Sequence, residues 1–296
     1  MTFEQQAKAY MTQIQTRRRN PVAQTTVDSY QSKLDTWLLP FFGQKDLSKI
    51  DNGLAKTFVK KLIENKLSAS TINVIFNVLK QIVASAVDEN GNRLYERSWN
   101  AEFLDLPVIS QSEQKAPCAT PSAIQTAIKA ASKQQYKALY ALLAGTGLRI
   151  GEALALDSTD WDRNAMTIEV NKTKTPNGVQ ENTKTQAGDR TVDLTPELNA
   201  FLIQTIGDVN GRLFPMGVMT VWENMEKNGL HGGAHTLRRF RETHLENSGV
   251  PRMLMKFWTG HAASDISERY IKFGPDIDAR KNWCVKAGLG FQLEAR

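Results

Sequence analysis

The hydrophobic periodicity of the chain changes twice, and this change limits the folds that the sequence can adopt. From residue 2 to about residue 88, apolar side chains recur at helical spacing. Residues 166–170 and 192–194 instead alternate apolar and polar side chains, which indicates strands. From about residue 196 the spacing is helical again. We therefore expect a mainly α protein whose second half also contains a small antiparallel sheet.

The loss of periodicity over residues 106–118, which include two prolines, predicts a linker between two domains. Residues 1–105 are then a helical domain, and residues 119–296 are an α+β domain. Both sizes are ordinary for folded domains. The chain of 296 residues is thus long enough for two separate cores.

Short polar and turn-forming residues mark several element ends. Thr26, Asp51 and Ser70 are predicted to begin helices, because their side chains can accept hydrogen bonds from the free N–H groups of a first turn. Residues 145–147 (Gly-Thr-Gly) and 176–178 (Pro-Asn-Gly) are predicted turns.

The chain is basic, with 37 lysines and arginines against 31 acidic residues and a formal charge of +6. Residues 1–105 carry 14 basic and 11 acidic side chains, which leaves 23 and 20 for the remainder, so each part has a charge of +3. A chain of this kind is drawn towards polyanions, and both domains are expected to contact one that is bound.

No apolar run is long enough to span a bilayer, and the first residues do not resemble a secretion signal. We therefore expect a soluble, cytoplasmic protein without a membrane partner. Cys118 and Cys284 lack the spacing of metal ligands and are expected to be reduced, buried thiols.

All four histidines lie between positions 231 and 261. His231 and His235 are four residues apart and could share a metal ion on one helical face. However, Gly232 and Gly233 lie between them, and no cysteine joins the group. A metal site is therefore not the favoured interpretation.

His235 and Arg238 are three residues apart, so a helix would place the imidazole and the guanidinium on one face. Gly249 is suited to end that helix, and Gly260 to end the next one, which leaves His261 at a helix exit.

Arg149 follows the turn at 145–147, and Glu152 lies three residues later, where it can hold the guanidinium in an ion pair. Two glycines in that turn allow another group to approach the backbone closely.

Taken singly, each of these residues has an ordinary structural explanation, such as a surface arginine, a solvated hairpin lysine or a core tyrosine. Their combination suits attack on a phosphodiester by a phenolic oxygen, because two guanidiniums can bind the phosphate, a base can activate the tyrosine, and a lysine can protonate the leaving oxygen. The candidate catalytic residues are Arg149, Lys184, His235, Arg238, His261 and Tyr270, with Glu152 in support.

Four stretches of the second half resemble the catalytic domain of the tyrosine recombinases, the phage integrase family. They are GTGLRIGEALAL, NTKTQAGDRTVDL, HTLRRF and TGHAASDISERYIKF, in the order and spacing of that family. The first half is similar to the family's helical, SAM-like core-binding domain, in TVDSYQSKLDTWLLPFFG and LSASTINVIFNVLKQIV. The resemblance covers nearly the whole chain.

The resemblance implies a role for each matching residue. Arg149 and Arg238 would bind the scissile phosphate while Tyr270 attacks it, which leaves a 3′-phosphotyrosyl bond and a free 5′-hydroxyl. Lys184 would be the general acid for that hydroxyl, with Lys172 and Lys174 as alternatives in the same hairpin region.

Of the remaining site residues, His235 would assist proton transfer at the tyrosine. His261 would form a hydrogen bond with the phosphate, and Glu152 would support the site. Trp258 departs from the family pattern, in which leucine is common at this position.

The resemblance also implies double-stranded DNA as substrate, a homotetramer on DNA, and no metal or other cofactor. Residues 275–296 would pack onto a neighbouring protomer. Accessory proteins that bend DNA or set the direction of recombination are further expected partners, in the cytoplasm of a bacterium or phage-infected cell. Two alternatives stay open: a topoisomerase that cleaves one strand through a similar site, and a DNA-binding relative without catalysis.

Overall fold

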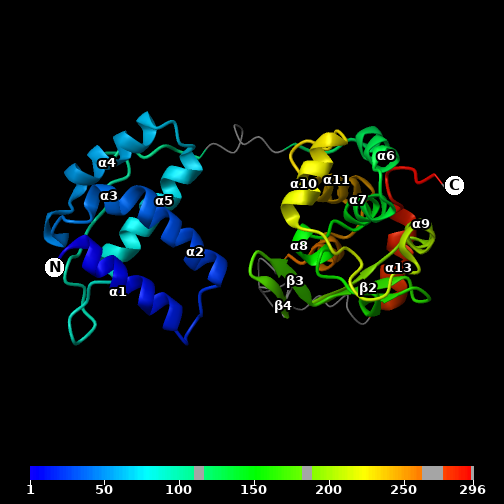
Figure 1. Cartoon of the computed structure of the whole chain (residues 1–296), viewed down its shortest axis with the longest axis horizontal. Helices are drawn as coiled ribbons and strands as arrows, with labels where there is room; N and C mark the ends of the chain where they lie inside the picture. The colour runs from blue at the N-terminus through cyan, green and yellow to red at the C-terminus, as the bar shows by residue number, and fades with distance from the viewer. Residues whose placement is uncertain (110–116, 182–188, 262–275, 295–296) are drawn as a thin grey trace. The chain divides into compact units, whose positions relative to one another are not determined.

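The computed structural model describes residues 1–109, 117–181, 189–261 and 276–294 (Figure 1). The chain divides into two compact units, Met1–Gln114 and Lys115–Arg296. The boundary lies within residues 106–118. In the described ranges no helix is both long and apolar enough to cross a membrane.

The first unit is helical. Its elements are α1 (Phe3–Thr16), α2 (Gln24–Lys33), a π-helical turn η1 (Leu34–Leu38), α3 (Leu39–Phe42), a 3-10 turn η2 (Leu47–Lys49), α4 (Asn52–Glu64) and α5 (Ala69–Ala84). Asp51 caps α4 as predicted, with its side chain accepting from Leu54 N. The cap of α5 is Ser68 rather than Ser70, because Ser68 offers the same hydroxyl half a turn earlier. Likewise α2 begins at Gln24, before Thr26.

Phenylalanine rings form the centre of this first core. The Phe42 ring centroid lies 5.6 Å from that of Phe3 and 4.8 Å from that of Phe58, and all three residues are fully buried. These rings join α1, α3 and α4, so the start of the chain is part of the core.

The second unit combines helices with short strands. Its elements are α6 (Pro121–Ala130), α7 (Gln134–Thr146), α8 (Ile150–Ala153), η3 (Ser158–Asp160), β1 (Trp161–Asp162), β2 (Thr167–Val170), β3 (Lys172–Thr175), β4 (Gly178–Glu181), β5 (Arg190–Asp193), α9 (Pro196–Ile206), α10 (Val218–Lys227), α11 (Ala234–Asn247), α12 (Arg252–Thr259) and α13 (Ile277–Ala287). The expected mainly α fold with a small antiparallel sheet is confirmed.

Helix α7 is the central helix of this unit. Nearly every residue from Tyr136 to Thr146 is buried, because α6, α9 and α11 pack around it. The turn predicted at residues 145–147 is wrong in part, since the helix continues through Gly145 and Thr146. A methyl group on Gly145 would lie 2.7 Å from a Leu198 methyl, so this glycine serves close packing.

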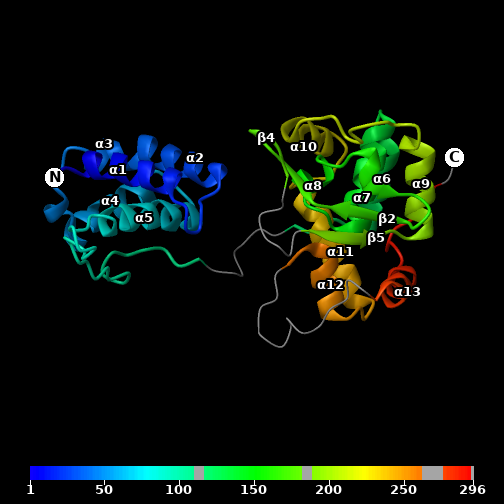
Figure 2. The same ribbon diagram turned by 90° about the horizontal axis from the view of Figure 1, so that it is seen from below.

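Two sets of strands follow. The order β1–β2–β5 makes a three-stranded antiparallel sheet, and β3 pairs with β4 around the predicted turn at 176–178. Arg190 lies opposite Val170 and Asp193 opposite Thr167, so the ladder fixes the register of both charged residues. Figure 2 shows α12 and α13 on one side of β5 and α6 on the other.

Asp193 connects β5 to both of these helices. Its carboxylate accepts hydrogen bonds from Trp258 Nε1 at 2.8 Å and from Arg280 Nε at 3.0 Å. The tryptophan at position 258 is therefore explained, because leucine has no N–H to offer this buried acid. In the single chain, α13 packs on its own unit, and its packing on a neighbouring protomer stays a prediction.

The two cysteines differ in environment. Cys284 on α13 is buried, and burial raises the pKa of its thiol to about 12. Cys118 is exposed, so its predicted burial is wrong.

Candidate active site

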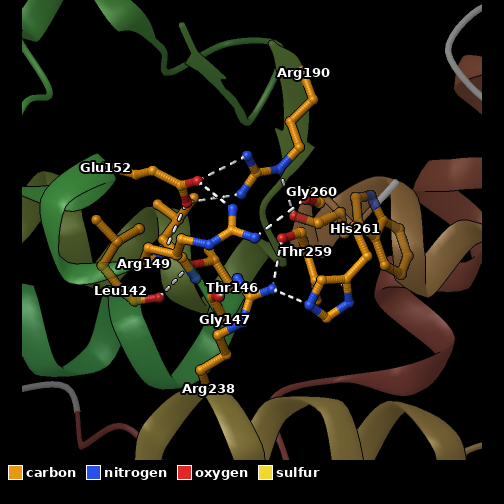
Figure 3. A network of polar contacts seen from close by, with 12 residues as sticks. Leu142, Thr146, Gly147, Arg149, Glu152, Arg190, Arg238, Thr259, Gly260 and His261 are labelled. Atoms are coloured by element: carbon orange, nitrogen blue, oxygen red, sulfur yellow. Dashed lines mark hydrogen bonds and ion pairs between the residues drawn. The ribbon is translucent and has the colours of Figure 1, made fainter. Parts of the chain in front are cut away.

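Four segments of the second unit meet at one point (Figure 3). They are the turn from α7 into α8, strand β5, helix α11 and the end of α12. Gly147 ends α7 in the left-handed conformation at φ 73°, and Gly260 ends α12 in the same way at φ 68°. The two helix ends thus present backbone carbonyls to the side chains between them.

Arg149 and Glu152 form the ion pair that their spacing predicts. Arg149 Nη1 donates to Glu152 Oε1 at 2.8 Å, and the Arg149 backbone N–H donates to Oε2 at 2.9 Å. The Arg149 side chain is 46% exposed whereas that of Glu152 is 3% exposed. Arg149 also donates to the Gly260 carbonyl at 3.2 Å. A buried acid and a helix end therefore hold a guanidinium that is open to solvent.

Glu152 contacts a second arginine, Arg190 of β5. Arg190 Nη2 donates to Glu152 Oε2 at 2.9 Å, and Nη1 to Oε1 at 3.3 Å. Burial alone would raise the pKa of the Glu152 carboxyl, but the hydrogen bonds and charge of Arg190, together with Arg149, hold it below its usual value. Glu152 is therefore ionised between two guanidiniums.

Arg238 projects from α11 towards the same cluster of side chains. Its Nη1 donates to the Gly147 carbonyl at 2.9 Å and its Nη2 to the Thr259 carbonyl at 2.7 Å. Nη2 also lies 2.9 Å from His261 Nε2, and the side chain is 3% exposed. This guanidinium is thus fixed by the ends of α7 and α12.

The contact between Arg238 and His261 defines the protonation of the ring. A guanidinium only donates, so His261 Nε2 accepts and the proton of the neutral ring is on Nδ1. Nδ1 lies 3.3 Å from Thr259 Oγ1. Burial, then the charge of Arg238 with further cations, holds the pKa of His261 below its ordinary value despite the opposing charge of Glu242.

His235 lies one turn before Arg238 on α11, and its side chain is exposed. Partial desolvation of the ring lowers the pKa of the imidazole, and the charges of Arg239 and Arg238 add to this effect. The ring is therefore a neutral base at pH 7, within electrostatic reach of the pocket.

The other two histidines serve different contacts. His231 Nδ1 lies 2.7 Å from a Glu226 carboxylate oxygen, and His244 Nε2 lies 2.8 Å from the Ala287 carbonyl. Across residues 1–109, 117–181, 189–261 and 276–294, no three His, Cys, Asp or Glu side chains are grouped so that they could bind a metal ion.

Lys184 and Tyr270 lie outside the described residues. The alternatives to Lys184 are both engaged elsewhere. Lys172 Nζ binds Asp157 and Asp160 at 3.0 and 2.8 Å, while Lys174 Nζ donates to the Met216 carbonyl at 2.8 Å.

Two charged residues of this pocket had no role in the sequence analysis. Arg190 lies on the same strand face as Val192 and Leu194. An arginine at the spacing of core residues was the sequence signal that could have identified it as a buried charge. Glu242 lies one turn after Arg238 on α11, with its Oε1 buried 3.1 Å from Arg238 Nε and 3.9 Å from His261 Nε2.

Comparisons with known proteins agree on one family. The model of the phage integrase family matches residues 119–274. The ICEBs1 integrase of Bacillus subtilis (strain 168) is 30% identical over 137 residues, which are 46% of this chain and 36% of that protein. The match thus spans about a third of the length of this curated relative.

Solved structures with the same fold include two integrases bound to DNA. The Tn1549 transposon integrase in complex with a circular intermediate DNA has a TM-score of 0.69 at 20% identity, over 96% of this chain and 94% of that chain. A lambda integrase dimer bound to a COC′ core site has a TM-score of 0.66 at 14% identity, over 100% and 99%.

Proposed function

Because the chain belongs to the phage integrase family of tyrosine recombinases, we propose that it is a site-specific DNA recombinase that cleaves and rejoins strands through Tyr270. The observation that carries this proposal is the meeting of Arg149, Arg238 and His261 beside two helix ends. Such a cluster of fixed donors suits a phosphate whose negative charge grows in the transition state.

In the proposed reaction Arg149 and Arg238 bind the non-bridging oxygens of the scissile phosphate. The Tyr270 oxygen attacks phosphorus, its proton passes to His235, and the bond to the 5′-oxygen breaks. Lys184 protonates that leaving oxygen. The 3′-phosphotyrosyl bond retains the energy of the phosphodiester, so a 5′-hydroxyl of another strand can reverse the step without ATP.

The contact between Arg238 and His261 adds one detail to this scheme. His261 Nε2 accepts from Arg238 and cannot donate to a phosphate oxygen in the same state. In the proposed complex the ring therefore leaves Arg238 and takes the other neutral tautomer, in which the Nδ1 proton is lost to solvent and Nε2 gains one that it donates to a phosphate oxygen. Arg238 in turn gains a free N–H for the phosphate.

We further propose a DNA-bound homotetramer, because exchange between two duplexes requires four cleavage events. The tetramer separates this function from that of a topoisomerase, which acts on one duplex. Synapsis of two labelled duplexes, measured by native electrophoresis, supports the recombinase. Relaxation of supercoiled plasmid without synapsis contradicts it.

A suicide substrate tests the chemistry. A library of nicked duplexes loses a short 5′-hydroxyl fragment after cleavage, so a covalent complex accumulates and is visible by denaturing electrophoresis. We expect it in excess EDTA, with mass spectrometry locating the adduct on Tyr270. Tyr270→Phe should abolish the complex and leave DNA affinity nearly unchanged, while Tyr136→Phe, in the first turn of α7, should retain both. An adduct on another residue, or none with wild-type protein, refutes the proposal.

A further inference from the structure

Arg190 binds Glu152, the carboxylate that also holds Arg149. Its side chain is 1% exposed, and its position is fixed by the pairing of β5 with β2. Besides both carboxylate oxygens of Glu152, it binds the carbonyl of Trp258 through Nε at 2.8 Å. One buried guanidinium thus connects strand β5, helix α8 and the end of α12.

Both anchors of Arg149 depend on Arg190. The first anchor, Glu152, accepts hydrogen bonds from both arginines. The second anchor, the Gly260 carbonyl, belongs to the helix end that Arg190 holds through the Trp258 carbonyl. The packing at this point is tight, since a methyl group on Gly260 would lie 2.7 Å from Arg190 Nη1.

The charge of Glu152 depends on Arg190 as well. A carboxylate that is 3% exposed tends to take up a proton unless cations surround it. Arg190 is as buried as the acid, whereas Arg149 is 46% exposed and is screened by water. Arg190 is accordingly the stronger of the two influences that lower the pKa of Glu152.

We propose that Arg190 is a positioning residue for strand cleavage, which keeps Glu152 ionised and oriented so that Glu152 aims the guanidinium of Arg149 at the phosphate. Arg190 itself does not touch the DNA. The inference rests on the proposed function, because it assigns to Arg149 the binding of the scissile phosphate.

The primary test compares Arg190→Met, which keeps the length and removes the charge, with Arg190→Lys, which keeps the charge. Single-turnover formation of the covalent complex should slow by about 10-fold to 100-fold in Arg190→Met, the loss typical when an orienting partner is removed. DNA affinity should change by less than about 3-fold, because phosphate contacts outside the pocket dominate it.

The dependence on pH separates positioning from a purely structural role. In Arg190→Met, Glu152 is buried with less positive charge, so it ionises only at higher pH. The ratio of wild-type to variant rate should therefore shrink as pH rises from about 6 to about 9. In Arg190→Lys the ratio should be smaller and constant with pH. A constant ratio in Arg190→Met overturns the inference.

A double-mutant cycle gives the second test. If Arg190 acts through Glu152, then Arg190→Met should change the rate by less than about 2-fold in a Glu152→Gln background. An equal loss in both backgrounds overturns the inference. Where Arg190→Met is not folded by calorimetry, Arg190→Lys replaces it in the cycle.

The matched control is Tyr140→Phe, which removes a partly buried hydrogen bond to Asn224 in the same unit, away from Glu152. It should lower stability without changing the rate. Failure of the proposed function itself is distinguishable, because wild-type protein would then form no covalent complex.

Discussion

Gly260 is the position where backbone conformation and packing constrain the proposed site together. Its φ of 68° lies in the left-handed region, where an L-residue costs about 1–2 kcal/mol. A Cβ would also lie 2.7 Å from Arg190 Nη1 and 3.3 Å from Arg149 Nη1. Arg190 cannot move aside without weakening its buried pair with Glu152, whose complete loss costs about 3–5 kcal/mol.

Gly260→Ala should therefore destabilise the second unit by about 3–5 kcal/mol. Gly249→Ala is the matched control, because Gly249 also ends a helix at a positive φ, of 71°, but has nothing within 4 Å of the added methyl. In that variant the free energy of unfolding should fall only by the cost of the left-handed backbone, about 1–2 kcal/mol.

Scanning calorimetry measures the difference. At about 2–4 °C per kcal/mol for a unit of this size, the melting temperature of Gly260→Ala should lie about 4–12 °C below that of Gly249→Ala. Gly260→Ala should also slow formation of the covalent complex, whereas Gly249→Ala should not. Equal melting temperatures for the two variants would show that the guanidiniums do not pack on Gly260 as described.

Three further predictions concern charge. Asp193→Asn should weaken the attachment of α13 to β5 and raise amide exchange across α13, as followed by mass spectrometry; unchanged exchange contradicts the role of Asp193. Glu242→Gln should lower the pKa of His261 further. The folded-state pKa of this ring is already below its usual 6.5, so the stability of the fold should be complete above about pH 6.5 and should fall on acidification, more steeply in the variant. NMR titration measures the pKa of His261, and calorimetry measures the stability. An unshifted titration refutes the contact between Glu242 and His261. DNA affinity should fall about 100-fold or more between about 50 and 200 mM salt in a filter-binding assay, and a flat response argues against phosphate contacts.

Local signals in the sequence predicted the elements that depend on local chemistry. Asp51 caps a helix as expected, and Gly249 and Gly260 end helices with the left-handed backbone. The ion pair of Arg149 with Glu152 could also be predicted from the sequence, because it joins residues one helical turn apart. Each of these features depends on a few neighbouring residues.

Features that depend on residues far apart in the chain could not be predicted from local sequence signals. Gly145 was assigned to a turn, but it lies inside α7, where Leu198 and Leu289 leave no room for a side chain. The role of Arg190 depends on Glu152 and Trp258, which are 38 and 68 positions away in the chain. Spacing places Arg190 in phase with core positions, but it does not reveal which distant residues the guanidinium binds.

The carboxylate of Asp193 closes a ring in the chain, because it binds Trp258 before the proposed nucleophile and Arg280 after it. The conformational entropy lost in closing such a ring grows only with the logarithm of its length, so doubling the length costs about 0.6 kcal/mol. A change in the number of residues between Trp258 and Arg280 therefore alters the free energy of closure only slightly, whereas a change of Asp193 removes both anchors.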